Sequence, residues 1–177
     1  AESESRQRLP TDVLFRSLGQ TQTPHALTYL IHKANDTTQP LPLRASAIRG
    51  IGHHRTPDAA IALLTYFNHP LSILQIAGIS ASAILGSSWA WKALGKELEG
   101  VQIRNKLAGG ILEAIQNTKS ISTAPLMARA QEVLATIGTQ ETLNQLEWLT
   151  KNTTPENQVF KFAKACLERV RLRLSRR

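Results

Sequence analysis

The chain has 177 residues, of which 42% are apolar and 19% are charged, so it is long enough to bury the core of a single globular domain. Its one cysteine excludes an intramolecular disulfide, and its formal net charge of +8 makes anionic partners a class to consider. The uncharged stretch over residues 59–91 is interrupted by serine, glutamine and a His-Pro pair, so we expect no membrane span of about 20 apolar residues.

The N-terminal half of the chain predicts a recurring unit of two helices joined by a break. Residues 44–64 read as a helix, a polar break and a second helix, and a shift of 33 residues places this unit on the one before it. The shift pairs Gly52 with Gly19, Thr56 with Thr23, Pro57 with Pro24, and Arg49 with Arg16. In each unit we expect the glycine to end the first helix in the left-handed conformation, and the Thr-Pro pair to cap and begin the second helix.

Looser copies of the unit follow further along the chain. A shift of 34 residues carries Gly52 onto Gly86, and residues 134–149 again place a break, at Gly138, between two helices. Four units are therefore supported by repetition alone.

The segment between the third and fourth copies departs from the repeat. Residues 101–116 predict a strong helix, and its two adjacent glycines indicate close helix packing. We interpret 101–123 as a unit whose second helix is short or missing, joined to the next unit by a loop. Thr154-Pro155 then predicts the start of a last helix, whose apolar stripe implies packing on the preceding unit.

The repeated unit resembles the short, bacterial type of HEAT-like repeat also seen in phycobilisome-lyase-like proteins. The residues that carry the resemblance are Arg44, Ala45, Ala47, Ile48, Ile51, Gly52, Thr56, Pro57, Asp58, Ala59, Leu63 and Leu64. The resemblance covers residues 10–100 well and 124–150 less well, and it implies a right-handed α-solenoid. It implies no activity, because function in such folds is carried by surface residues, and no bilin-handling motif carries over.

The expected fold class is therefore all-α: a short right-handed α-solenoid of about five HEAT-like helical hairpins with a C-terminal capping helix. We expect a polar N-terminal extension over 1–9, a single HEAT-like repeat domain over 10–168, and a basic C-terminal end of the last helix over 169–177.

The chemistry-bearing residues do not form a catalytic, cofactor or metal motif. His53 and His54 with Asp58 suggest a metal site, but adjacent histidines point in different directions and no ligand pair at helical spacing supports them, so we interpret them as solvated loop residues. Cys166 falls on the apolar stripe of the last helix and is expected to be a buried structural thiol. We therefore expect a protein that is not an enzyme, with no cofactor.

Two features of the sequence point to partners. Five arginines in 169–177 carry much of the excess charge, and the uncharged helices over 59–91 could offer an apolar groove. Our first hypothesis is a protein-binding scaffold or assembly subunit, with self-association possible, and the alternative is nucleic-acid binding through repeated arginines and the arginine-rich end. The candidate partner-binding residues are Trp89, Trp91, Arg16, Arg49, Arg169, Arg171 and Arg173.

The start of the given sequence bears on the expected cellular location. The chain begins AESESRQR, with neither an initiator methionine nor an apolar signal core. We expect a cytoplasmic protein, and a secreted or periplasmic mature form is the alternative.

Overall fold

The computed structural model describes residues 11–118 and 124–176, and within these ranges the chain forms helices and no strand. This confirms the all-α prediction. The helices are α1 (Thr11–Gln20), α2 (Pro24–Asn35), α3 (Leu41–Gly52), α4 (Pro57–Leu64), α5 (Ser72–Leu85), α6 (Ser88–Ala93), α7 (Glu97–Asn117), α8 (Ala124–Ile137), α9 (Gln140–Asn152) and α10 (Gln158–Leu174).

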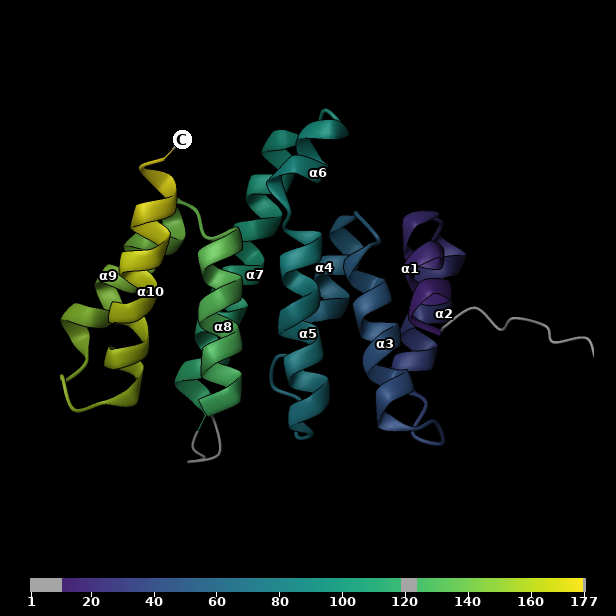
Figure 1. The fold of residues 1–177 in the computed structure, drawn as a ribbon, viewed down its shortest axis with the longest axis horizontal. Coiled ribbons are helices and arrows are strands. Elements are labelled where there is room, and N and C mark those ends of the chain that lie inside the picture. Colours follow the sequence, from purple (N-terminus) through teal and green to yellow (C-terminus); the bar gives the residue numbers. More distant parts are fainter. Residues whose placement is uncertain (1–10, 119–123, 177) are drawn as a thin grey trace, which may run out of the picture.

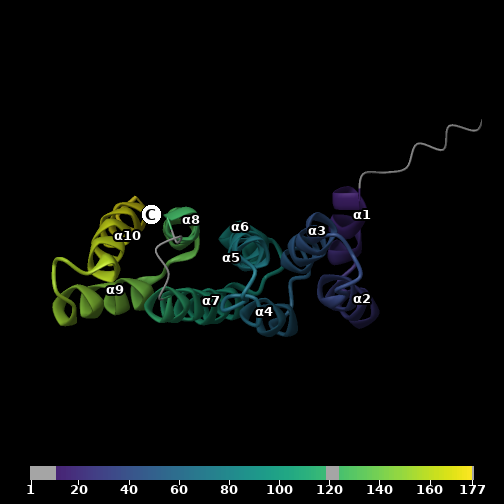
Figure 2. The same ribbon diagram turned by 90° about the horizontal axis from the view of Figure 1, so that it is seen from below.

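Nine of these helices lie in two layers, and the chain alternates between them (Figure 1, Figure 2). Helices α1, α3, α5, α8 and α10 form what we call the first layer, in which each helix packs on the next. Helices α2, α4, α7 and α9 form the second layer, where α7 contacts both α4 and α9. Apolar side chains from both layers make one continuous core that runs from Phe15 in α1 to Val170 in α10.

The short helix α6 interrupts this alternation and changes the interpretation of the third unit. The helix predicted over 101–116 is the central part of α7, a second-layer helix, and it follows α5 in the alternation. The segment 101–123 is therefore not a separate unit that lacks its second helix, and residues 119–123 lie outside the described ranges. Within the described ranges, the alternation gives four successions of a first-layer and a second-layer helix, α1–α2, α3–α4, α5–α7 and α8–α9, followed by α10, where about five helical hairpins were expected.

The Thr-Pro pairs begin helices where the sequence predicts it in the first two units. The Thr23 hydroxyl accepts a hydrogen bond from the Ala26 N–H at 3.3 Å and caps α2, with proline at the first helical position. The Thr56 hydroxyl does the same for α4. The corresponding prediction for Thr154-Pro155 is wrong, because α10 begins later and its cap is the side chain of Asn157.

The repeated glycines allow first-layer helices to pack closely. The expectation that they end helices in the left-handed conformation is wrong, because among the described glycines only Gly95, in the loop before α7, has a positive φ, of 67°. A Cβ atom on Gly19, Gly52 or Gly86 would fall within 2.7 Å of the next first-layer helix, and one on Gly138 would fall 3.0 Å from it. The nearest groups on that helix are the Gly50 carbonyl for Gly19, the Ala81 carbonyl for Gly52, the Ile137 side chain for Gly86 and the Val170 side chain for Gly138.

The two break histidines are not equally solvated. His54 is only 1% exposed, so its interpretation as a solvated loop residue is wrong. Its Nε2 donates to the carbonyl oxygen of Thr23 at 3.0 Å, and its Nδ1 lies 3.0 Å from the hydroxyl of Thr56. The imidazole therefore joins the breaks of two consecutive units and satisfies both of its ring nitrogens. His53 is half-buried, and burial followed by the charges of Arg16 and Arg55 lowers its pKa.

The C-terminal arginines belong to a packed helix. Of the expected basic end over 169–177, residues up to Leu174 are part of α10, and Val170 within it is fully buried. The expected N-terminal extension over 1–9 lies outside the described residues. No described helix is both long and apolar enough to cross a membrane.

The single thiol is buried, as the sequence predicts, and its reactivity tests this placement. Burial raises the pKa of Cys166 to about 12, so at pH 8 only about one thiol in 10⁴ is ionised, against roughly a quarter of ordinary thiols. We expect the native protein to react with a disulfide reagent at pH 8 about 10³-fold more slowly than the denatured protein. Equal rates in the native and denatured states would contradict the buried position.

Candidate functional site

The two layers carry charge of opposite sign. The five first-layer helices hold nine Lys or Arg and three Asp or Glu, a net charge of +6. The four second-layer helices hold four Lys or Arg and six Asp or Glu, a net charge of −2. The two faces of the molecule therefore suit partners of different charge.

A hollow on the first layer lies over α5, which carries no charged residue. This hollow, which we call the α5 groove, has a volume of about 590 Å³. Its lining consists of Pro42, Ala45 and Arg49 of α3, Ser72, Ile73, Ile76, Ala77 and Ser80 of α5, and Arg129 of α8. Small and branched apolar side chains thus form the floor, and one arginine stands on each side.

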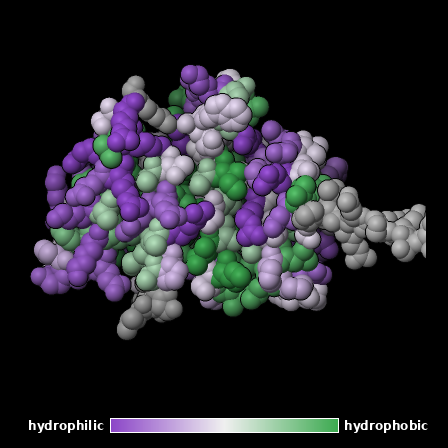
Figure 3. Space-filling view, viewed as in Figure 1, coloured by the Kyte–Doolittle hydropathy of each residue, from purple (hydrophilic) through white to green (hydrophobic). Residues whose placement is uncertain are grey.

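Hydrophobic side chains gather over α5 on this face, between hydrophilic regions on either side (Figure 3). Ile73 is 42% exposed at the start of α5, and the exposed side chains of Leu41 and Leu71 lie at the N-terminal ends of α3 and α5. The absence of charge in α5, noted in the sequence, therefore produces exposed apolar surface as well as core.

Arg49 is fixed at one side of the α5 groove by two hydrogen bonds. Its Nη2 atom donates to the carboxylate of Asp12 at 3.0 Å and to the hydroxyl of Ser46 at 2.9 Å. The hydrogen bonds from Ser46 and then Arg49 lower the pKa of Asp12, so this carboxylate stays ionised near neutral pH.

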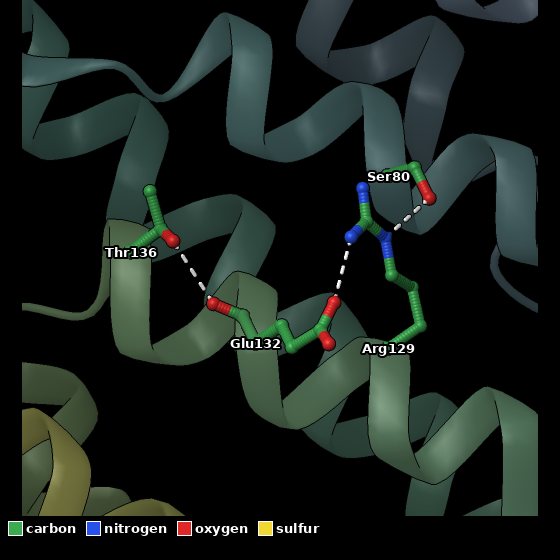
Figure 4. A network of polar contacts seen from close by, with 4 residues as sticks. All are labelled: Ser80, Arg129, Glu132 and Thr136. Carbon is green, nitrogen blue, oxygen red and sulfur yellow. Dashed lines mark hydrogen bonds and ion pairs between the residues drawn. The ribbon is translucent and has the colours of Figure 1, made fainter.

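Arg129 is fixed at the other side by contacts from two helices. Its Nε donates to the Ser80 hydroxyl of α5 at 2.8 Å, and its Nη1 lies 2.7 Å from the carboxylate of Glu132, one turn along α8 (Figure 4). Thr136 donates to the backbone carbonyl of Glu132 and continues this polar row along α8.

Each of these arginines can still bind an anionic group. A guanidinium has five N–H donors, and Arg49 and Arg129 each use two of them in the hydrogen bonds described. Because their orientations are already set by neighbours, little side-chain entropy is lost when a ligand binds. The α5 groove therefore combines an apolar floor with two oriented donors for carboxylates.

The repeated arginines predicted as contacts lie together at the α1–α3 end of the first layer. Arg16 is exposed and, with Arg49 and His53, lines a hollow of about 200 Å³. The repeat equivalence of Arg16 and Arg49 thus places both on one surface.

The predicted C-terminal arginines have different surroundings. Arg169 is exposed. Arg171 forms an ion pair of 2.9 Å with Glu147 of α9, and Arg173 donates to the backbone carbonyl of Thr136 in α8. Arg171 and Arg173 therefore attach α10 to its neighbours.

The two candidate tryptophans of α6 separate into one surface and one core residue. Trp89 is 75% exposed, and Leu94 and Leu98, which follow it along the chain, are exposed as well; we call these three residues the α6 corner. Trp91 is 1% exposed, and its indole N–H donates to the carbonyl of Leu85 at 2.6 Å. Trp91 is therefore removed from the candidate contact surface.

Sequence reasoning missed Arg129 and Ser80, which complete the α5 groove. They lie 49 residues apart and meet only because α8 packs on α5. The lack of charge in α5 was the one available signal.

Within the described ranges no three His, Cys, Asp or Glu side chains cluster in a way that could hold a metal ion.

A comparison of the chain with protein-family models finds no matching family, and a comparison with curated proteins finds no matching protein.

Proposed function

We propose that this chain is a non-enzymatic scaffold that binds a protein partner in the α5 groove. The observation that carries the proposal is the apolar floor of the groove between two anchored arginines, Arg49 and Arg129. A partner segment with bulky apolar side chains flanked by carboxylates is complementary to it in both shape and charge. The exposed α6 corner offers a second apolar contact for the same partner or for another subunit.

We also propose that the scaffold is a HEAT-like right-handed α-solenoid. The alternation of nine helices between two layers and the repeated glycine contacts along the first layer support this proposal. In such an architecture each helical pair buries its apolar face against its neighbours, and the row of pairs leaves an extended surface for recognition.

Peptide selection tests the proposed groove without a known partner. We expect random 12-residue peptides displayed on phage to yield a consensus with Leu, Ile or Phe flanked by Asp or Glu. A synthetic consensus peptide should lose at least about tenfold in affinity for the variant Ile73→Glu, which places a negative charge on the apolar floor. Arg129→Gln should weaken the same peptide, because an amide cannot replace the charged donors.

The matched control changes another exposed apolar residue, on a different first-layer helix. Leu172 of α10 is 54% exposed, and Leu172→Glu should leave the affinity of the peptide unchanged. A consensus without acidic residues, or equal losses for Ile73→Glu and Leu172→Glu, would refute the α5 groove as the site.

The net charge of +6 on the first layer favours nucleic-acid binding as the alternative function. Against it, Arg49, Arg129 and Arg171 each already have a carboxylate partner, which lowers the positive charge available to phosphates.

Fluorescence anisotropy with random duplex and single-stranded nucleic acid, titrated with salt, separates the two functions. We expect no binding near physiological salt, and a log–log slope equivalent to several phosphates would overturn the ranking. Arg169→Gln with Arg176→Gln is the suitable charge variant, because deleting 169–177 would also remove the buried Val170.

A further inference from the structure

A second groove lies on the opposite layer, between α7 and α9, and its chemistry differs from that of the α5 groove. This hollow, which we call the α7–α9 groove, has a volume of about 470 Å³, within the range of about 300–1,000 Å³ that is typical of ligand clefts. Glu113 and Glu141 contribute carboxylates to its lining, and no lysine or arginine lines it. The nearest cation on α7, Lys106, lines the neighbouring hollow beside α4.

One wall of the α7–α9 groove is an exposed indole. Trp148 of α9 is 60% exposed although the ring is large and apolar. Glu141 and Trp148 are seven residues apart, so they share one face of α9 with about 10 Å of helix between them. A tryptophan face near carboxylates attracts a cation through its ring quadrupole, and tryptophan is the best ring for this interaction.

The groove also contains an acceptor without a donor. The side-chain Oε1 atom of Gln145, which lies between Glu141 and Trp148 along α9, is buried and has no hydrogen-bond partner within the described part of the chain. A buried acceptor left unpaired costs free energy, and a ligand N–H recovers that cost when the amide of Gln145 turns its oxygen toward the groove. This acceptor is independent of the carboxylates and indicates the same kind of ligand.

The carboxylate of Glu141 is held in position from the neighbouring helix. Asn105 of α7 donates to one of its oxygens and accepts from the hydroxyl of Thr139, which caps α9. The second-layer helices together carry a net charge of −2, so the field around the groove also favours a cation.

We propose that the α7–α9 groove binds an arginine side chain presented by a basic segment of a partner protein. The guanidinium lies on the ring of Trp148 and donates N–H groups to the carboxylates of Glu113 and Glu141, and to Gln145 Oε1 once the amide of Gln145 turns toward the groove. Arginine fits better than lysine because its planar group stacks on an aromatic face and offers five donors in a fixed arrangement. This site is on the other face of the molecule from the α5 groove, so the two proposals fail or succeed separately.

The test follows the indole N–H signal of Trp148 in the full-length ¹⁵N-labelled protein, assigned with the variant Trp148→Phe. The probes are 12-residue Gly/Ser peptides that carry arginine, lysine, citrulline or glutamate at the same positions. We expect the arginine peptide to shift this signal in a saturable way, with at least tenfold weaker binding of the neutral citrulline peptide and several-fold weaker binding of the lysine peptide. Lysine binding as tight as arginine, or no shift with the arginine peptide, would overturn the proposal.

Variants separate a binding role from a structural one. Glu113→Gln and Glu141→Gln should each weaken the arginine peptide several-fold, whereas Asp58→Asn removes an exposed carboxylate from α4 of the same layer and should have no effect. Gln145→Leu should weaken binding and at the same time raise the melting temperature, because it removes the unpaired acceptor. Equal effects of Asp58→Asn and the groove variants would reduce the interaction to general charge attraction and refute the site. Self-association of the parent protein without any peptide, measured by sedimentation and lost in Trp148→Phe, would assign the groove to a second copy of this chain. That result would also overturn the proposal.

Discussion

Replacing Trp91 with alanine is expected to lower the free energy of unfolding by about 3–5 kcal/mol. The side chain is 1% exposed and its indole N–H is hydrogen-bonded to the carbonyl of Leu85 at the end of α5. Its ring also packs directly on Gly100 of α7, where a Cβ atom would fall 2.5 Å from the ring. The substitution therefore leaves a cavity and an unpaired carbonyl at the junction of three helices, and denaturation in urea followed by circular dichroism measures the cost.

Trp89 provides the control for this experiment, because it is the same residue type two positions earlier in α6. Its side chain is 75% exposed, so Trp89→Ala should change the free energy of unfolding by no more than about 0.5 kcal/mol. A similar loss of stability in both variants would show that the two tryptophans are not divided between surface and core. If the α6 corner is a contact surface, Trp89→Ala weakens partner binding while stability is retained.

The sequence could not have told which of these tryptophans is buried. Residues two apart on a helix point about 200° away from each other, so one of them faces the core whenever the other faces solvent. The choice is made by Gly100, nine residues further on, which leaves room for the ring of Trp91. Such a choice depends on how α6 and α7 pack, and no local pattern records it.

The elements that sequence reasoning predicts well are those set by local chemistry. Thr23 and Thr56 cap their helices because a hydroxyl placed before a proline and a helical run can accept from the free N–H groups of the first turn. The same reasoning fails at Thr154-Pro155, where Asn157 supplies a cap nearer to the apolar stripe of α10. The repeat also paired Arg16 with Arg49 as equivalent positions, and both line one hollow because equivalent positions in stacked units lie on the same face.

The parts that could not be predicted depend on contacts across long separations. The α5 groove needs Arg129 of α8, and the repeat pattern gave no register between α8 and α5 because α6 and the long α7 intervene. The α7–α9 groove likewise brings together two helices that the third and fourth pairs contribute separately. The order in which the helices alternate between the two layers explains why α8 lies beside α5 and why α7 lies beside α9.

The close approach of first-layer helices predicts a second large effect, at Gly52. Gly52→Ala is expected to lower the free energy of unfolding by about 1–3 kcal/mol, because the new Cβ atom would fall 2.7 Å from the carbonyl oxygen of Ala81 and 3.0 Å from its Cβ. The obstructing oxygen belongs to the backbone of α5, so no side-chain rotation can relieve the clash and α3 must move away from α5. Denaturant unfolding measures the loss.

Gly109 is the matched control for this substitution, because a Cβ atom there would have no neighbour within 4 Å. Gly109 lies inside α7, so Gly109→Ala should raise the free energy of unfolding by about 0.5–1 kcal/mol through helix propensity alone. The two substitutions add the same methyl group and should change stability in opposite directions. If Gly52→Ala is as stable as the parent, the first-layer helices are not held at the separation that the repeated glycines imply, and the stacking of units must rest on apolar side chains alone.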